Sequence, residues 1–388
     1  MSNTDINTEL EKAPEAGVIP AVANGMVRVS VVMPIYNERD FLPASLECIA
    51  NQTLKEIEII CIDDGSTDNS LEVLKSFQKK DERIRIVTET NAGPALARNN
   101  GIRRVRGEYV AFLDADDIFE PTLLEDLYNE AKRGDLDIVI TNYDIYNNRK
   151  EKFEKAVPAD REDIYVPGKV TSKSEHPDVI FQSTSGMAWN KLFKSSFIEE
   201  KKLAFLPDVK LYEDVYFVMT ALSLAERIGS VHKTLVHHRV YSEQSRAKMF
   251  RKYYYQIPMI YLRVKEFLMH NGMYAPLSDS FVHITASRCY KIYNLLSGED
   301  KEKFWNMFYG EDAEALDWVG KDPEFFEGDL RDFVANVTMY EHRNYVKYAS
   351  KGKTIPPKKL KKKMQEATSR KRIKGFLSRL FKRNKKDN

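Results

Sequence analysis

The amino-acid sequence predicts an α/β fold with a mainly parallel sheet flanked by helices. Short β-branched segments alternate with segments of helical periodicity through residues 27–133, and strands that alternate with helices in short periods usually pair in parallel. Polar groups suited to chemistry follow the strand segments, where such sheets bind their ligands. With 388 residues and 43% apolar side chains, the chain is long enough for a large core.

Eight segments make up this alternation. The expected strands are "VRVSVVMPIY" (27–36), "EIEIICIDD" (56–64), "RIRIVTE" (83–89) and "GEYVAFLDADD" (107–117). The expected helices are "ERDFLPASLECIANQT" (38–53), "TDNSLEVLKSFQKK" (67–80), "GPALARNNGIRRV" (93–105) and "PTLLEDLYNEAKR" (121–133). Pro121 is typical of the first turn of a helix, which does not need the N–H that proline lacks.

Composition argues against several other classes of protein. The three cysteines are widely spaced in apolar stretches, which indicates a reducing cytoplasm and neither a disulfide framework nor a zinc site: Cys48, Cys61 and Cys289. The N-terminus has no apolar signal segment, and no eighteen apolar residues run together, so we expect neither a signal peptide nor a spanning helix. A dehydrogenase would carry a G-x-G-x-x-G turn where this chain has "MPIYNE".

Charge and periodicity divide the chain into four parts. We expect a disordered lead-in over 1–26, the α/β domain over 27–245, a small helical module over 246–350 and a basic amphipathic tail over 351–388. The tail holds 16 Lys or Arg against two acidic residues, so its net charge of +14 leaves −12 for the rest of the chain.

The tail has the pattern of an amphipathic helix. Arg and Lys occupy one face, and apolar residues recur at helical spacing on the other: Ile373, Phe376, Leu377, Leu380 and Phe381. Such a helix is typical of proteins that bind an anionic membrane surface. A solvated tail and a nucleic-acid-binding tail are the alternatives; we expect the membrane and no nucleic acid.

Four polar clusters are expected to meet at one edge of the sheet, because each follows a strand: "PIYNE", "DDGSTD", "ETNAGPALARN" and "DADD". Asp114 and Asp116 are two residues apart, so in an extended chain both point to the same side, as a chelating pair does. Carboxylates are hard oxygen ligands that suit Mg²⁺ or Mn²⁺ bridging to a diphosphate.

The neighbouring clusters carry groups that can recognise a nucleotide. Asp63 or Asp64 can accept an N–H from a nucleobase edge, and Tyr36 offers a ring face for stacking. The guanidinium of Arg98 can pair with phosphate oxygens. The alternatives are structural: Ser66 caps the following helix, and Arg98 is a solvent-facing charge.

The segments "VSVVMPIYNERDFLPASLECIANQT", "IICIDDGSTDNS", "NAGPALARNNGI" and "GEYVAFLDADD" resemble the successive motifs of the family 2 glycosyltransferases, inverting enzymes of GT-A fold that use nucleotide-sugar donors. The resemblance covers about residues 28–145. It implies that Asp114 and Asp116 form a DxD motif holding the metal and the donor diphosphate. It also implies a nucleotide pocket lined by Pro34, Tyr36, Glu38, Asp63, Asp64 and Arg98.

Three later segments are similar to acceptor-side parts of the family. In "LYEDVYFVMTAL", Glu213 and Asp214 match the ED motif, whose aspartate deprotonates the acceptor; the alternative is an acidic pair favoured by a helix N-terminus. In "GMAWNKLFKSSFI", Trp189 is expected either to stack on a sugar or to lie in the core. In "HHRVYSEQSRA", His237 and His238 are expected as metal ligands, with ordinary strand residues as the alternative. Arg239 in the same segment could reach the metal or the diphosphate.

The resemblance implies a metal-dependent, hexosyltransferase-type enzyme, and the basic tail indicates the cytoplasmic face of the cell membrane. It would transfer a sugar from a nucleotide sugar, UDP being expected, to a hydroxyl of a lipid-linked or growing glycan in bacterial-type surface polysaccharide synthesis. The alternative is a catalytically silent relative that binds nucleotide sugars or acts as a membrane scaffold. Every acidic position expected of an active enzyme is filled, which favours the enzyme.

Overall fold

A computed structural model describes residues 26–154, 161–240, 250–309, 312–340, 342 and 345–346. The predicted lead-in, apart from Met26, and the predicted tail lie outside these residues. The described chain falls into two compact units. The first holds the described residues up to 240 together with 266–277, and the second holds the remainder from 250 onward.

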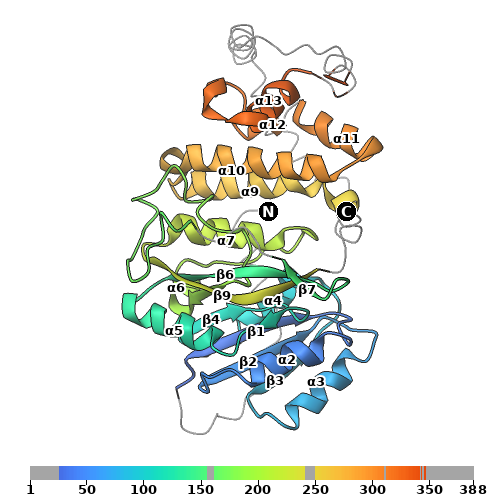
Figure 1. Cartoon of the computed structure of the whole chain (residues 1–388), viewed down its shortest axis with the longest axis vertical. Coiled ribbons are helices and arrows are strands. Elements are labelled where there is room, and N and C mark those ends of the chain that lie inside the picture. The colour runs from blue at the N-terminus through green and yellow to red at the C-terminus, as the bar shows by residue number, and fades with distance from the viewer. Residues whose placement is uncertain are drawn as a thin grey trace. The chain divides into compact units, whose positions relative to one another are not determined.

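Nine strands of the described chain form one sheet in the first unit (Figure 1). They are β1 (Val29–Ile35), β2 (Ile57–Asp63), β3 (Ile84–Thr88), β4 (Tyr109–Phe112), β5 (Ile118–Phe119), β6 (Ile138–Asn147), β7 (Lys152–Glu154), β8 (Lys191–Lys194) and β9 (Ile228–Val240). Their order is β3-β2-β1-β4-β8-β6-β9-β5, with β7 paired to β6.

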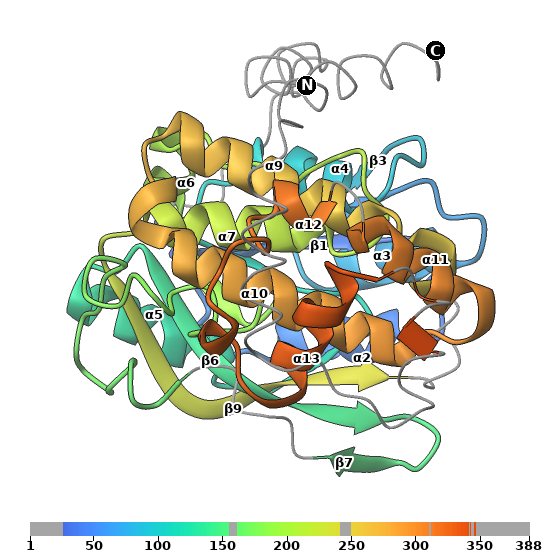
Figure 2. The ribbon, with the colours of Figure 1, turned by 90° about the horizontal axis from the view of Figure 1, so that it is seen from above.

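The first four strands are parallel, which confirms the predicted sheet. β1 pairs with β2 and β4, and β2 pairs with β3. Beyond β4 the sheet is mixed, because β8 lies antiparallel between β4 and β6. The long β9 runs parallel to β6 and antiparallel to β5, and Figure 2 shows it curving beside β6, with β7 at the outer edge.

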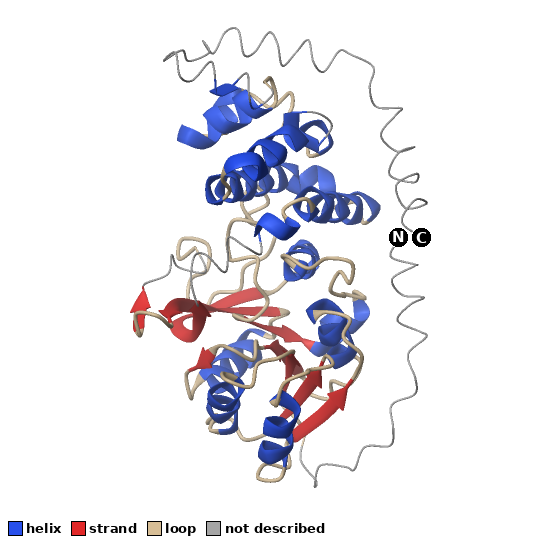
Figure 3. Ribbon diagram, turned by 90° about the vertical axis from the view of Figure 1, so that its right-hand side faces the viewer, coloured by secondary structure: helices blue, strands red, loops and turns tan. Residues whose placement is uncertain are grey.

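Helices cover both faces of the sheet (Figure 3). Those of the first unit are α2 (Leu42–Ala50), α3 (Ser70–Gln78), α4 (Pro94–Ile102), α5 (Leu123–Gly134), α6 (Ser195–Glu200) and α7 (Glu213–Leu224). Side chains of α2, α3 and α5 pack with Val29, Val31 and Met33 of β1 in one buried cluster. Because side chains alternate along a strand, Val32 faces the opposite side, toward α4.

Close packing of α4 on the sheet depends on Gly101. A Cβ at this position would lie 2.2 Å from Val32 Cγ1, so only glycine lets the helix approach β1 this closely. On the same face, four buried phenylalanines join β4 and β8 to α7: Phe112, Phe193, Phe205 and Phe217. The rings of Phe205 and Phe217 stack at 4.2 Å. This aromatic cluster fixes α7 and hence the acidic residues at its start.

The second unit is helical, as predicted for the C-terminal region. Its elements include parts of α9 (Gln256–His270) and α10 (Tyr274–Leu295), then α11 (Gly298–Tyr309), α12 (Asp312–Ala315), the short η1 (Pro323–Phe325) and α13 (Gly328–Val337). Trp305 and Trp318 are buried, and their indole N–H groups donate to Tyr340 O at 2.7 Å and Thr285 Oγ1 at 2.9 Å. Among the described helices, none combines the length and apolar character needed to cross a bilayer.

Candidate active site

The loops that carry the predicted site residues converge at one edge of the sheet. Ile35, at the end of β1, pairs with Asp63 at the end of β2, and Asp63 pairs with Thr88 at the end of β3. β4 ends at Phe112, just before the acidic turn. The carboxyl ends of parallel strands therefore bring these loops together.

Three carboxylates cluster in the turn between β4 and β5. One oxygen from each of Asp114, Asp116 and Asp117 lies within 4.8 Å of the others. Burial, together with the charges of Asp117 and Asp114, raises the pKa of Asp116 to about 7. Asp117 is fully buried, and its Oδ2 has no hydrogen-bond partner among the described residues. A lone buried oxygen among mutually repelling carboxylates fits a divalent cation.

Asp117 belongs to the predicted DADD cluster, although strand alternation alone would not bring it to the other two acids. In an extended chain it would point away from Asp114 and Asp116. The extended segment ends at Phe112, however, and Asp117 N–H donates to Asp114 O at 3.4 Å across a turn. The turn brings the third carboxylate back to the other two.

Glu38, in the loop after β1, is a fourth carboxyl of this group. Burial, followed by the charges of Asp116 and Asp114, raises the pKa of Glu38 to about 8. Its backbone N–H donates to Ser70 Oγ at 2.8 Å, which anchors the loop on the start of α3. Glu38, which is predicted to line the nucleotide pocket, is thus close enough to the acidic turn for the charges there to raise its pKa.

Arg98 links the acidic turn to the start of α7. Its Nη2 is 2.6 Å from Asp114 Oδ1, and its Nη1 is 2.7 Å from Glu213 Oε1. Burial alone would lower the pKa of Arg98, but Asp114 and Glu213 outweigh it and raise the pKa, so the guanidinium stays charged. The predicted phosphate-binding arginine therefore has two carboxylate partners in this structure.

Asp214 is buried in the first turn of α7, beside Glu213. Its Oδ2 accepts a hydrogen bond from the backbone N–H of Ala188 at 3.3 Å. Burial and the charge of Glu213 raise the pKa of Asp214 to about 7, against the opposing effect of Arg98. A carboxylate with a pKa near neutrality is suited to accept a proton from a hydroxyl group.

Trp189, which follows Ala188, is a core side chain with 5% of its surface exposed. Its ring stacks on His238, with 5.0 Å between centroids and 12° between planes, and it meets Tyr143 edge-on at 4.7 Å. Two roles are predicted for Trp189, stacking on a sugar and packing in the core. Its burial matches the core. One ring face is already covered by the imidazole.

The two predicted histidines have different neighbours. His238 Nδ1 lies 3.0 Å from Asp117 Oδ1. Burial would lower the pKa of His238, but Asp117 and then Asp116 raise it to about 9, so the ring carries a proton toward the acidic turn. His237 Nδ1 is instead 2.6 Å from Asp144 Oδ1, and its Nε2 is 2.9 Å from Glu120 Oε1. Only His238 is brought to the acidic turn.

The predicted nucleotide-side residues lie on the loops after β1 and β2. The Tyr36 side chain is exposed, which leaves its ring available for stacking, while Pro34 is half-buried within β1. Asp63 is buried and its Oδ1 accepts the N–H of Ser66 at 3.2 Å. Asp63 thus shapes the turn after β2.

Asp64 holds the loop that precedes α4. Its two carboxylate oxygens accept the backbone N–H groups of Ala92 at 2.7 Å and Gly93 at 2.8 Å. Gly93 has a φ of 99°, a conformation that glycine adopts readily. Asp64 therefore sets the start of α4, the helix that carries Arg98.

Arg239 closes the acidic turn from β9. Its backbone N–H donates to Asp117 Oδ1 at 2.9 Å, and its Nε donates to Asp116 O at 2.7 Å. The guanidinium lies between the rings of Phe41 and Tyr146, at 5.2 and 5.3 Å. Arg239 therefore contacts the turn that carries the acidic residues, and its predicted contact with a metal or diphosphate stays a prediction.

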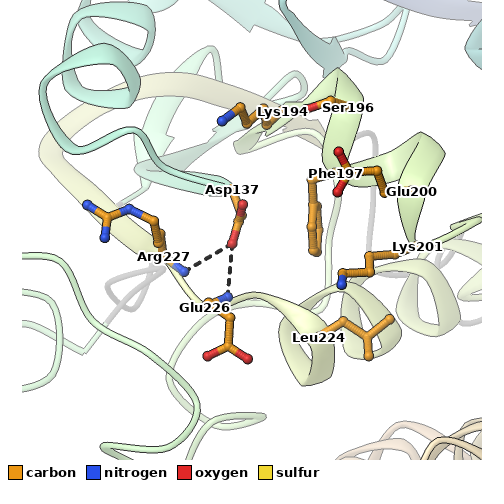
Figure 4. Close-up of a pocket in the computed structure, with 9 residues that line it drawn as sticks. All are labelled: Asp137, Lys194, Ser196, Phe197, Glu200, Lys201, Leu224, Glu226 and Arg227. Carbon is orange, nitrogen blue, oxygen red and sulfur yellow. Dashed lines mark hydrogen bonds between the residues drawn. The ribbon is translucent and has the colours of Figure 1, made fainter.

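A separate hollow of about 230 Å³ lies at the starts of β6 and β9 (Figure 4). Its lining residues are Asp137, Lys194, Ser196, Phe197, Glu200, Lys201, Leu224, Glu226 and Arg227. The Asp137 carboxylate accepts the backbone N–H groups of Glu226 at 2.9 Å and Arg227 at 3.1 Å. None of the predicted site residues lines this hollow.

Residues 30–193 match the model of the family described as "Glycosyl transferase family 2". Over 268 residues the chain is 30% identical to EpsH of Bacillus subtilis (strain 168), which is named as a glycosyltransferase; the match covers 67% of this chain and 76% of EpsH. It is 33% identical over 210 residues to the poly(ribitol-phosphate) beta-glucosyltransferase of Bacillus spizizenii, covering 52% of this chain but only 31% of that relative.

The fold is similar to that of TarS residues 1–349 from S. aureus, solved in complex with UDP-GlcNAc. The TM-score is 0.61 at 19% sequence identity, and the match covers 85% of this chain and 93% of the TarS chain. This likeness confirms the predicted fold class.

Proposed function

The chain belongs to glycosyl transferase family 2, and on that premise we propose that it transfers a sugar from a nucleotide-sugar donor to a hydroxyl group of a glycan or lipid-linked acceptor, with inversion at the anomeric carbon. The observation that carries this proposal is the double ion pair of Arg98. It joins Asp114, a member of the acidic turn, to Glu213, the neighbour of Asp214. This link supports a single site for the proposed donor-side and acceptor-side groups.

A divalent cation, Mn²⁺ or Mg²⁺, is proposed as the cofactor. Asp114, Asp116 and Asp117 would hold it through carboxylate oxygens, which fits an Asp117 Oδ2 that has no hydrogen-bond partner within the described chain. When bound, the cation neutralises charge that develops on the departing nucleoside diphosphate. His238 remains a proposed neighbour of the cation; in this structure its Nδ1 contacts Asp117.

Asp214 is proposed as the general base. The acceptor oxygen attacks the anomeric carbon of the donor while the bond from that carbon to the diphosphate oxygen breaks. The hydroxyl proton passes to the Asp214 carboxylate, and the nucleoside diphosphate leaves with the bonding electron pair. Burial keeps the pKa of Asp214 at about 7, high enough for the carboxylate to accept the proton and low enough for it to be ionised near neutrality.

The donor is proposed to be a UDP sugar. TarS, which shares the fold, was solved with UDP-GlcNAc. In this chain the exposed Tyr36 ring could stack on the base beside the buried Asp63. The named activity of the Bacillus spizizenii relative, a poly(ribitol-phosphate) beta-glucosyltransferase, supports a polymer as the acceptor class.

The proposed location is the cytoplasmic face of the cell membrane, through residues 351–388. Sixteen basic residues in that tail would be attracted to anionic lipids. Attachment to the surface would raise the effective concentration of a lipid-linked acceptor near the enzyme.

Thermal unfolding with nucleotides tests this function. We expect UDP plus Mn²⁺ to raise the melting temperature more than GDP, CDP or ADP, and Asp116→Asn to abolish the metal-dependent part. A ligand at a hundred times its dissociation constant stabilises the fold by roughly 2.7 kcal/mol, which is readily detected. Release of UDP from UDP sugars in the presence of acceptor then separates an enzyme from a silent nucleotide-sugar-binding relative. No shift with any nucleotide would contradict the proposed site.

A further inference from the structure

Lys191 is a buried lysine at the start of β8, with 1% of its surface exposed. Its Nζ donates hydrogen bonds to three oxygens of the preceding segment, each at 2.8 Å: Ser185 O, Met187 O and Asn190 Oδ1. An ammonium group has three N–H donors, so these bonds draw three points of one short segment around a single nitrogen.

The far end of that segment is bound to the sheet. Asn190 Nδ2 donates to Thr141 O at 2.8 Å, and Thr141 N–H donates to Asn190 O at 3.0 Å, which ties the segment to β6. Ser185 Oγ also lies 3.1 Å from Asn190 Oδ1. The segment 185–190 therefore has one anchor on β6 and a second on the Lys191 ammonium.

Two site contacts depend on the path of this segment. Ala188 N–H donates to Asp214 Oδ2, and the Trp189 ring stacks on His238. We propose that Lys191 is a positioning residue, which fixes the segment 185–190 so that Ala188 N–H orients the Asp214 carboxylate. The effect on catalysis rests on the proposed function, whereas the effect on the path of the segment 185–190 does not.

The loss of this hydrogen bond would change both the orientation and the acidity of Asp214. A backbone N–H donated to a carboxylate favours its ionised form, so without the bond the carboxyl group holds its proton more tightly. The charged groups that face Asp214 are Glu213 from its own helix, Arg98 from α4 and Asp114 from the turn after β4. The 2.8 Å hydrogen bonds of the Lys191 ammonium go to Ser185, Met187 and Asn190, whereas Glu213 and Asp114 are held by Arg98.

The chain offers a matched control in Lys173. This lysine is also buried in the first unit, where its Nζ pairs with Glu226 and lies 3.4 Å from Ala225 O. Lys173→Met removes a buried ammonium of the same kind without touching the segment 185–190. Lys191→Met removes the proposed anchor at nearly unchanged side-chain length.

Hydrogen exchange of the full-length variants, followed by mass spectrometry on a peptide covering 185–190, is the first measurement. We expect the Ala188 amide to exchange about tenfold faster or more in Lys191→Met than in the wild type, and at the wild-type rate in Lys173→Met. Transfer kinetics follow. Lys191→Met is expected to lower kcat by about tenfold to a hundredfold, because small misplacement of a reacting group is costly. The acidic limb of its pH profile should move to higher pH, with the donor KM within about twofold of the wild type.

Lys191→Gln is the variant of choice if Lys191→Met does not fold, because the amide keeps two N–H donors; we expect an intermediate exchange rate. Unchanged exchange at Ala188 in a folded Lys191 variant overturns the proposal. Faster exchange with wild-type kcat and pH profile overturns its catalytic part. If the wild type transfers no sugar, the proposed function fails, and the exchange rates alone decide the role of Lys191.

Discussion

Arg98 and Glu213, 115 positions apart in the chain, form an ion pair with 2.7 Å between Nη1 and Oε1. The guanidinium at this contact is almost buried, and its other terminal nitrogen contacts Asp114. Nothing local in the sequence specifies this contact. It places the start of α7 against the acidic turn.

Asp214→Asn should lower kcat by about a hundredfold to ten-thousandfold, because the amide cannot accept the hydroxyl proton. UDP binding, measured by calorimetry with Mn²⁺, should stay near the wild-type value, since Asp214 is proposed to act on the acceptor and not on the donor. Asp208→Asn, an exposed acid upstream on the chain, is the matched control and should retain activity. Full transfer by Asp214→Asn would show that another group is the base.

The transfer rate should fall as the pH drops below about 7. Asp214 has a folded-state pKa raised to about 7 by burial and Glu213, and only the ionised carboxylate can act as a base. The pH profile of kcat/KM between pH 5.5 and 8.5, at constant ionic strength, checks this. A profile that is flat down to pH 5.5 would rule out a base with this pKa.

Arg98→Met should lower the free energy of unfolding by about 3–5 kcal/mol, because two partly buried carboxylates lose their shared counter-ion. The matched control is Arg133→Met, whose arginine is about half exposed and pairs with Glu130 on the surface. It should cost less than about 1 kcal/mol. Urea unfolding measures the free energy of unfolding of both variants. Equal losses would mean that the Arg98 pairs contribute no more to stability than a surface pair.

Gly101→Ala should lower the free energy of unfolding by about 1–3 kcal/mol, because the new methyl group overlaps Val32. Val32→Ala opens space at the point of overlap, but as a single substitution it also lowers the free energy of unfolding. In the double variant the two costs should be less than additive. Strictly additive costs would mean that the strain in Gly101→Ala does not come from contact with Val32.

Removing residues 351–388 should abolish binding to vesicles that contain anionic lipid, while transfer to a soluble acceptor stays unchanged. The basic charge of the tail supplies the attraction, and the predicted site residues all precede it. Sedimentation with anionic and with neutral vesicles provides the comparison. Unchanged partition after truncation would contradict the membrane role and leave the catalytic proposal intact.

Local pattern was enough to predict the first half of the fold. The segment 56–64 reads as a strand because it is rich in β-branched isoleucine and ends in acids, and β2 spans Ile57–Asp63. The predicted strand 107–117 is too long, since β4 ends at Phe112. Three carboxylates in the next five positions occupy a turn instead of extending the ladder.

Long-range contacts account for what the pattern did not reveal. β8 pairs antiparallel with β4, and no local periodicity indicates that partner. Whether His237 or His238 reaches the acidic turn depends on the register of β9. The role of Asp64 is likewise set by its partners Ala92 and Gly93 in another segment, because carboxylates are common at every strand end.

The sheet order also has a consequence for how the chain folds during synthesis. β4 lies next to β8 in the sheet, yet β8 begins only at Lys191, so one edge of β4 has no ladder partner until that segment leaves the ribosome. Arg239 and His238 are made later still and close the acidic turn. A nascent chain therefore has an exposed β4 edge until β8 joins the sheet, and an open acidic turn until β9 joins it.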